Sequence, residues 1–126
     1  MVILVVEDEE QVRVLAESIL QEEGHATLSA GTTEQALALL EGSEPIELLF
    51  IDLTLQSDPE AGLSLASKAV ELRPDLKVLY TSGQGVTDGM IALFVKNSAY
   101  LPKPYTGDQL KAALLLKFGI RQGQSK

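Results

Sequence analysis

Cysteine is absent from the sequence, and histidine occurs once. Without cysteine the chain can form neither a disulfide bond nor a thiolate metal site, which fits a reducing compartment such as the cytoplasm. Basic side chains are also scarce, since 10 lysines and arginines stand against 18 aspartates and glutamates and leave a net charge of -8. Affinity for nucleic acid depends on neutralising phosphates with basic side chains, so we expect no direct nucleic-acid binding.

Long apolar runs are missing as well. No stretch reaches the ~20 apolar residues that span a membrane, so we expect no membrane insertion. The first six residues are apolar but carry no basic leader and run into four acidic residues, 7–10, so we expect no signal peptide. The 126 residues, of which 45% are hydrophobic and 22% charged, suit one globular domain. We expect that domain over 1–119 and a short tail over 120–126.

Short apolar runs alternate with segments of helical periodicity along the whole chain. An uninterrupted apolar run that ends in a loop is typical of a parallel strand covered on both faces. We expect strands at 2–6, 25–29, 48–52, 78–80 and 99–101. The helix expected after the first strand has an apolar stripe formed by Val12, Leu15, Ala16, Ile19 and Leu20.

The other helices are marked by their ends. Thr32 with Gln35, and Thr106 with Gln109, have the form of capping boxes, and Gly24, Gly42 and Gly119 are typical C-terminal stops. The third helix carries Leu63, Ala66, Ala69 and Val70 inward and stops before Pro74, while the last buries Leu110, Ala113, Leu114 and Phe118. The segment 86–96 is the weakest, because Gly89 accompanies its apolar residues Met90, Leu93 and Phe94.

This alternation predicts a doubly wound α/β domain with a five-stranded parallel sheet and helices on both faces. Right-handed crossovers place the first and third strands side by side, which gives the strand order 2-1-3-4-5. Open parallel sheets bind ligands beyond the carboxyl ends of their strands. The polar residues expected at that edge are Glu7, Asp8, Asp52, Thr81 and Lys103.

Three carboxylates at one edge would repel one another unless a cation shared the site. Hard oxygen ligands without histidine or cysteine favour Mg²⁺, and Lys103 would add a positive group aimed at a phosphoryl oxygen. Each residue taken alone also has a structural explanation. Asp52 could begin a turn, the acidic run 7–10 could be a solvated first helical turn, and Lys103 could be a surface lysine.

Four stretches, taken together and in order, resemble the receiver domain of two-component response regulators. They are Val5-Val6-Glu7-Asp8-Glu9, Asp52 after an apolar strand, Leu79-Tyr80-Thr81-Ser82-Gly83, and Tyr100-Leu101-Pro102-Lys103-Pro104. The resemblance covers essentially the whole chain and implies the flavodoxin-like receiver fold. The residue sequences of the last two stretches are similar to those of receivers associated with hybrid histidine kinases.

The resemblance also implies roles for the acidic residues. Asp52 would be the phosphoacceptor, Asp8 a direct Mg²⁺ ligand, Glu7 a ligand through water, and the backbone carbonyl of Thr54 a further ligand. The phosphoryl donor would be a sensor histidine kinase or a histidine phosphotransfer protein, and a weak homodimer is a further expected partner. Such a domain catalyses its own phosphorylation and dephosphorylation without being a turnover enzyme.

The remaining implied roles concern signalling. Lys103 would pair with the phosphoryl oxygens, and its bond to Pro104 would be cis. Thr81 would turn its hydroxyl onto the phosphoryl group, and Tyr100 would follow between outward and inward rotamers. The weak segment 86–96 is suited to respond, because a switch needs an element of marginal stability.

The chain departs from the family pattern in the loop after Asp52. Gln56 stands where a proline is usual, and Gly62 comes ten positions after Asp52 instead of about eight. We infer a two-residue insertion within 57–60, which covers the site and puts phosphatase access and partner choice in question.

Three other functions stay open at this stage. A flavin-binding domain shares the topology, but the acidic run 7–10 would repel its phosphate. A phosphohydrolase of the haloacid-dehalogenase type needs a carboxylic acid two residues after its nucleophile, where this chain has Thr54. A receiver-like interaction scaffold would not need phosphate. We expect His25, the single histidine, to be structural or exposed and not a phosphate carrier.

Overall fold

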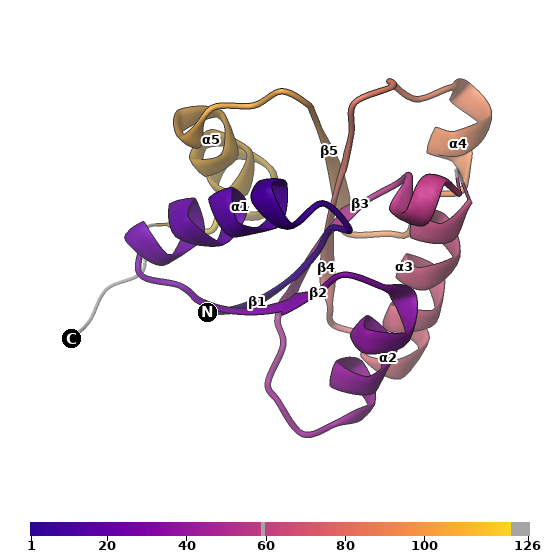
Figure 1. The fold of residues 1–126 in the computed structure, drawn as a ribbon, viewed down its shortest axis with the longest axis horizontal. Helices are drawn as coiled ribbons and strands as arrows, with labels where there is room; N and C mark the ends of the chain where they lie inside the picture. Colours follow the sequence, from indigo (N-terminus) through magenta and orange to yellow (C-terminus); the bar gives the residue numbers. More distant parts are fainter. Residues whose placement is uncertain (59, 122–126) are drawn as a thin grey trace.

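The computed structural model describes residues 1–58 and 60–121 and has the alternating architecture expected (Figure 1). Its strands are β1 Val2–Val6, β2 Ala26–Ala30, β3 Leu48–Asp52, β4 Lys77–Ser82 and β5 Ser98–Pro102. Its helices are α1 Glu10–Glu22, α2 Thr33–Glu41, α3 Ala61–Leu72, α4 Asp88–Ala92 and α5 Gly107–Phe118, with a 3₁₀ turn, η1, at Leu55–Ser57. All the strands pair in parallel in the predicted order, β2-β1-β3-β4-β5.

Helices cover the sheet on both faces and enclose two separate cores. Helices α1 and α5 lie on one side of the sheet, and α2, α3 and α4 lie on the other (Figure 1). Strand β3 serves both cores, because Leu48 and Phe50 point to the α1 and α5 side while Leu49 and Ile51 point to the other. This alternation explains why β3 reads as a continuous apolar run.

The ends of the helices follow the capping signals with one difference. At α5 both halves of the capping box form between Thr106 and Gln109. At α2 the Thr32 hydroxyl accepts from the Gln35 N–H, but the Gln35 side chain accepts from the N–H of Gly31 at 2.8 Å. The capping box predicted at α2 is therefore wrong in its second bond, because the Gln35 side chain accepts from the N–H of Gly31 instead of that of Thr32.

One apolar residue was assigned to the wrong face, and one lies outside the helix it was expected to join. Leu15 was placed on the buried stripe of α1 but is 56% exposed, while Ala16 and Leu20 are buried as expected. Leu93 lies beyond the end of α4 and is 63% exposed, whereas Met90 and Phe94 pack against the core. The helical repeat alone misled the prediction, because an apolar residue at either position is compatible with burial.

Candidate functional site

The strand register brings the polar residues to one level at the carboxyl edge of the sheet. Val6 at the end of β1 pairs with Ile51, so Glu7 follows at the level of Asp52. Asp52 in turn pairs with Thr81 of β4. Lys103 directly follows Pro102, the last residue of β5, which pairs with Ser82. All the candidate residues from four strands thus meet at this edge.

Lys103 joins two of the carboxylates. Its Nζ lies 2.7 Å from Glu7 Oε1 and 3.0 Å from Asp52 Oδ2. Only 5% of either acidic side chain is exposed, and 18% of the lysine. Charge-assisted hydrogen bonds of this kind are strong where water is excluded. The lysine is therefore held within reach of the Asp52 carboxylate instead of lying free on the surface.

The pKa values of Glu7 and Lys103 follow from their burial and from the contacts between their charged groups and those of Asp52. Burial raises the pKa of Glu7, and the nearby Asp52 charge adds to that, while hydrogen bonds from Lys103 and the Glu9 N–H oppose it. Burial lowers the pKa of Lys103, but its bonds to Glu7 and Asp52 outweigh that effect and leave the pKa raised. Lys103 consequently stays charged at neutral pH.

Asp52 is fixed from its other oxygen by Thr54. The Thr54 N–H and its hydroxyl both donate to Asp52 Oδ1, at 3.0 Å and 3.1 Å. The sequence interpretation used only the Thr54 carbonyl and missed this side chain. A signal was available for the contact of the Thr54 N–H, because an aspartate side chain commonly accepts a hydrogen bond from the backbone N–H two residues later.

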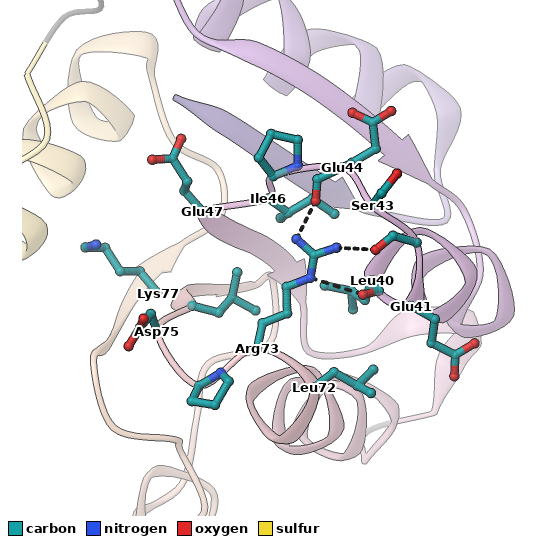
Figure 2. Close-up of a pocket in the computed structure, with 14 residues that line it drawn as sticks. Leu40, Glu41, Ser43, Glu44, Ile46, Glu47, Leu72, Arg73, Asp75 and Lys77 are labelled. Carbon is teal, nitrogen blue, oxygen red and sulfur yellow. Dashed lines mark hydrogen bonds between the residues drawn. The ribbon is translucent and has the colours of Figure 1, made fainter.

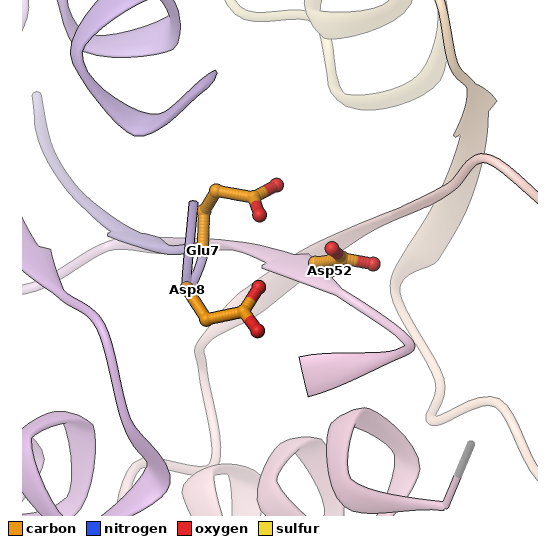
Figure 3. A group of neighbouring side chains, drawn as sticks. All are labelled: Glu7, Asp8 and Asp52. Atoms are coloured by element: carbon orange, nitrogen blue, oxygen red, sulfur yellow. The ribbon is translucent and has the colours of Figure 1, made fainter. Parts of the chain in front are cut away.

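The three acids form a cluster that suits a divalent cation. Glu7, Asp8 and Asp52 each place a carboxylate oxygen within 4.8 Å of the others. Figure 3 shows the Glu7 and Asp8 side chains extending from the end of β1 toward the side on which Asp52 lies. Glu7 and Asp52 are buried, whereas Asp8 is exposed. Oxygen donors alone, beside open solvent, match the preference of Mg²⁺ for carboxylates and waters.

The two predicted switch residues flank the site. The hydroxyl of Thr81 is buried and has no hydrogen-bond partner within the described residues. The Tyr100 hydroxyl donates to the carbonyl of Ser82, one residue beyond Thr81, at 3.2 Å. The Lys103–Pro104 bond is cis, as expected. A buried hydroxyl without a hydrogen bond destabilises the folded state, so the Thr81 hydroxyl is available to bond to a new group.

A shallow depression of about 330 Å³ opens onto Asp8, Asp52 and Lys103 of the site. The residues that line it are Asp8, Glu9, Asp52, Thr54, Ser57, Gly83, Gln84 and Lys103. A larger cleft of about 710 Å³ lies at the opposite, amino-terminal edge of β3 and β4. There the Arg73 guanidinium donates to the carbonyls of Leu40, Gly42 and Glu44 (Figure 2). Those contacts tie the end of α3 to the α2–β3 connection.

His25 also has a structural place. It is 6% exposed, and its Nδ1 lies 3.4 Å from the N-terminal ammonium of Met1. Burial lowers its pKa, and the ammonium lowers it further. It lies between α1 and β2 and takes no part in the acidic cluster.

Comparison with known proteins decides the family. The family model described as the response regulator receiver domain matches residues 3–115. The chain belongs to the response regulator receiver domain family. The receiver assignment confirms the resemblance, the doubly wound fold and a role in two-component signal transduction.

Individual relatives agree with this assignment. The nitrogen assimilation regulatory protein NtrX of Azorhizobium caulinodans is 33% identical over 86% of this receiver domain and 24% of its own length. A response regulator of Burkholderia pseudomallei, solved with a phosphorylated aspartic acid and a calcium ion, is 30% identical over 90% of this chain and 65% of that one, with a TM-score of 0.78. The receiver domain of the hybrid histidine kinase CckA is 28% identical over 93% and 98%, with a TM-score of 0.76.

The receiver domain spans about a quarter of the length of the first curated relatives it matches. The expected partner, a histidine kinase or a histidine phosphotransfer protein, stays a prediction. In the described part of the receiver domain, none of the helices combines the length and apolar character that crossing a membrane requires. The domain boundary at residue 119 and the cytoplasmic location stay predictions. Within the expected tail, 120–126, residues 122–126 lie outside the described residues. Pro59, which belongs to the inferred insertion, also lies outside them.

Proposed function

We propose that Asp52 is the residue that accepts the phosphoryl group, from a histidine kinase or a histidine phosphotransfer protein. The observation that carries this proposal is the convergence on one carboxylate. Asp52 combines Lys103 at 3.0 Å, two further acids within 4.8 Å and a place in the lining of the depression, whereas Glu7, which shares the first two features, does not line it. The Burkholderia relative carries a phosphorylated aspartic acid, which supports aspartate as the acceptor type.

The reaction is a transfer between two nucleophiles. An oxygen of the Asp52 carboxylate forms a bond to phosphorus while the bond between phosphorus and the donor imidazole nitrogen breaks. Lys103, already 3.0 Å from Asp52, neutralises charge on the transferred group. Thr54 holds the carboxylate in one orientation until transfer. Water later breaks the acyl phosphate, which returns Asp52 to its free state.

We further propose Mg²⁺ as the cation of the acidic cluster. Asp8 is the direct ligand in this proposal, with Asp52 and the Thr54 carbonyl, and Glu7 acts through water. The contrast between Asp8 and Glu7 supports Asp8 as the direct ligand of the two, because Asp8 is exposed, whereas Glu7 is buried and bonded through both oxygens, to Lys103 at 2.7 Å and to the Glu9 N–H at 3.1 Å. Mg²⁺ would supply positive charge to the phosphoryl oxygens during transfer.

The test is phosphorylation by a small donor. Incubation with acetyl phosphate and MgCl₂ should raise the intact mass of the wild type by one phosphate. Asp52→Asn should show no increase, because its amide lacks the anionic oxygen. Asp75→Asn is the matched control, since Asp75 lies at the opposite edge of the sheet, and it should behave as the wild type. Phosphorylation that persisted in Asp52→Asn would contradict the assignment.

A further inference from the structure

The turn η1 at Leu55–Ser57 lies against the acidic cluster and occupies oxygen atoms of two of its proposed metal ligands. The Gln56 N–H donates to Asp8 Oδ2 at 2.9 Å. The next amide, that of Ser57, donates to the Thr54 carbonyl at 3.3 Å. Two consecutive backbone amides of one turn are thus directed at Asp8 and Thr54.

The turn is anchored at one end and strained in the middle. Leu55 is fully buried, while Gln56 and Ser57 are exposed. Gln56 has φ 54° and ψ 35°, and Ser57 has φ 63°. The left-handed region is unfavourable for residues other than glycine, so this conformation persists only where its contacts compensate. The bonds to Asp8 and Thr54 are those contacts.

The amides and a cation compete for the same oxygens. A backbone N–H offers a partial positive charge to Asp8 Oδ2, whereas a divalent cation offers two full charges at the same place. A cation that coordinates Asp8 and Thr54 removes the acceptors that hold the turn, and the strain at Gln56 and Ser57 then favours its release.

We propose that η1 is a metal-sensitive latch. Its backbone amides close on Asp8 and Thr54 in the metal-free receiver domain and release when a divalent cation binds there. The latch lowers the affinity for the cation and couples metal occupancy to the conformation of the segment beside Asp52. This inference rests on the Mg²⁺ site proposed above, and no part of it depends on phosphorylation.

Three substitutions at Gln56 separate the backbone amide from the side chain. Gln56→Pro removes the N–H and cannot adopt a positive φ, so it should abolish the latch. Gln56→Ala keeps the N–H and is the matched control for loss of the side chain. Gln56→Gly keeps the N–H and removes the strain, so it should strengthen the latch.

The readout is titration with MgCl₂ followed by NMR of the backbone amides. In the wild type, Mg²⁺ should speed the solvent exchange of the Gln56 and Ser57 amides while the amides of α1 stay unchanged. The dissociation constant for Mg²⁺ should be lower in Gln56→Pro than in Gln56→Ala by roughly threefold to tenfold, and higher in Gln56→Gly. Circular dichroism verifies that each variant is folded.

The failures of the latch and of the metal site are distinguishable. Saturable Mg²⁺ binding that left exchange at Gln56 and Ser57 unchanged would overturn the latch alone, without reference to any variant. Equal dissociation constants for Gln56→Pro and Gln56→Ala would do the same. If Mg²⁺ produced no saturable change at Asp8, or bound Asp8→Ala as well as the wild type, both the proposed site and the latch would be overturned.

Discussion

At the scale of single residues, Gly62 marks the closest approach of α3 to the strand that carries Asp52. A Cβ atom at this position would lie 2.6 Å from the Cα of Leu53 and 2.7 Å from the carbonyl oxygen of Asp52. Both neighbours are backbone atoms of one buried segment, so neither can move without displacing the acceptor. The glycine ten positions after Asp52 is therefore required by packing.

We expect Gly62→Ala to lower the free energy of unfolding by about 1–3 kcal/mol, the usual cost of overpacking. Gly89→Ala is the control, because the nearest atom to a Cβ there is 3.8 Å away, and its stability should be unchanged or raised by up to roughly 1 kcal/mol. Urea unfolding followed by circular dichroism measures both. Equal stabilities of the two variants would show that α3 can shift at no cost.

The charged residues of the site could be predicted because each directly follows an apolar run. In a parallel sheet the carboxyl ends of strands share one edge, so Asp52 and Lys103 were expected to meet although 51 positions separate them. The contacts of Thr54 and Gln56 could not be predicted in the same way. The Thr54 N–H contact has a local signal in the aspartate two residues earlier, but the hydroxyl contact depends on a side-chain rotamer. The Gln56 contact depends on a left-handed backbone conformation that residues other than glycine seldom adopt.

At the scale of elements, α4 is the least anchored helix. It is five residues long and none of them is buried. Met90 packs against the core from within α4, and the segment that follows α4 is held by Tyr80, which precedes Thr81. The Tyr80 ring stacks on Phe94 with 4.0 Å between centroids, and its hydroxyl accepts from the Val95 N–H at 3.1 Å. Tyr80 therefore links the strand of the site to the segment that follows α4.

We expect Tyr80→Phe to keep the ring stack and to leave the Val95 N–H without its partner. The free energy of unfolding should fall by about 1 kcal/mol. Exchange of the Val95 amide should accelerate by about tenfold, with the amides of α1 as the internal reference. Hydrogen exchange monitored by NMR measures both effects. An unchanged Val95 amide would show that the hydroxyl does not restrain this segment.

The weakness of α4 was predictable and its boundaries were not. Gly89 and a thin apolar stripe indicated a short helix within 86–96, and the structure confirms one at Asp88–Ala92. Thr87 caps the start of the helix, because its hydroxyl accepts from the Met90 N–H at 3.1 Å. The capping pattern identified at Thr32 and Thr106 had no glutamine or glutamate to reveal it here. Strand β4 also extends to Ser82, because pairing with β5 continues past the apolar run.

At the scale of the whole molecule, the site lies where both cores meet. Asp52 ends the strand that serves both faces of the sheet, while Thr81, its partner in β4, lies with Phe50 and Tyr105 on the side of α1 and α5. A phosphoryl group on Asp52 would add about -1.5 to -2 charge, by analogy with phosphate esters. The Thr81 hydroxyl, buried and without a partner among the described residues, is available to donate to that group.

We expect the response to be largest on the α4 side of the sheet, because Tyr80, the residue before Thr81, stacks on Phe94 and accepts from the Val95 N–H. With a non-covalent phosphate mimic and MgCl₂, we expect backbone protection to change mainly over 82–100 and in the segment 55–58. The amides of 12–20 should change little, because Ala16 and Leu20 anchor α1 in the other core. Thr81→Ala should still be phosphorylated on Asp52, since the hydroxyl does not contact that carboxylate, but its response over 82–100 should be lost. Changes over 55–58 should persist in this variant, because the bond from Gln56 to Asp8 does not involve Thr81. Hydrogen exchange on wild type and Thr81→Ala, with and without the mimic, distinguishes the two routes. Equal responses over 82–100 would exclude Thr81 as the relay and would leave the turn after Asp52 as the path by which the signal reaches α4.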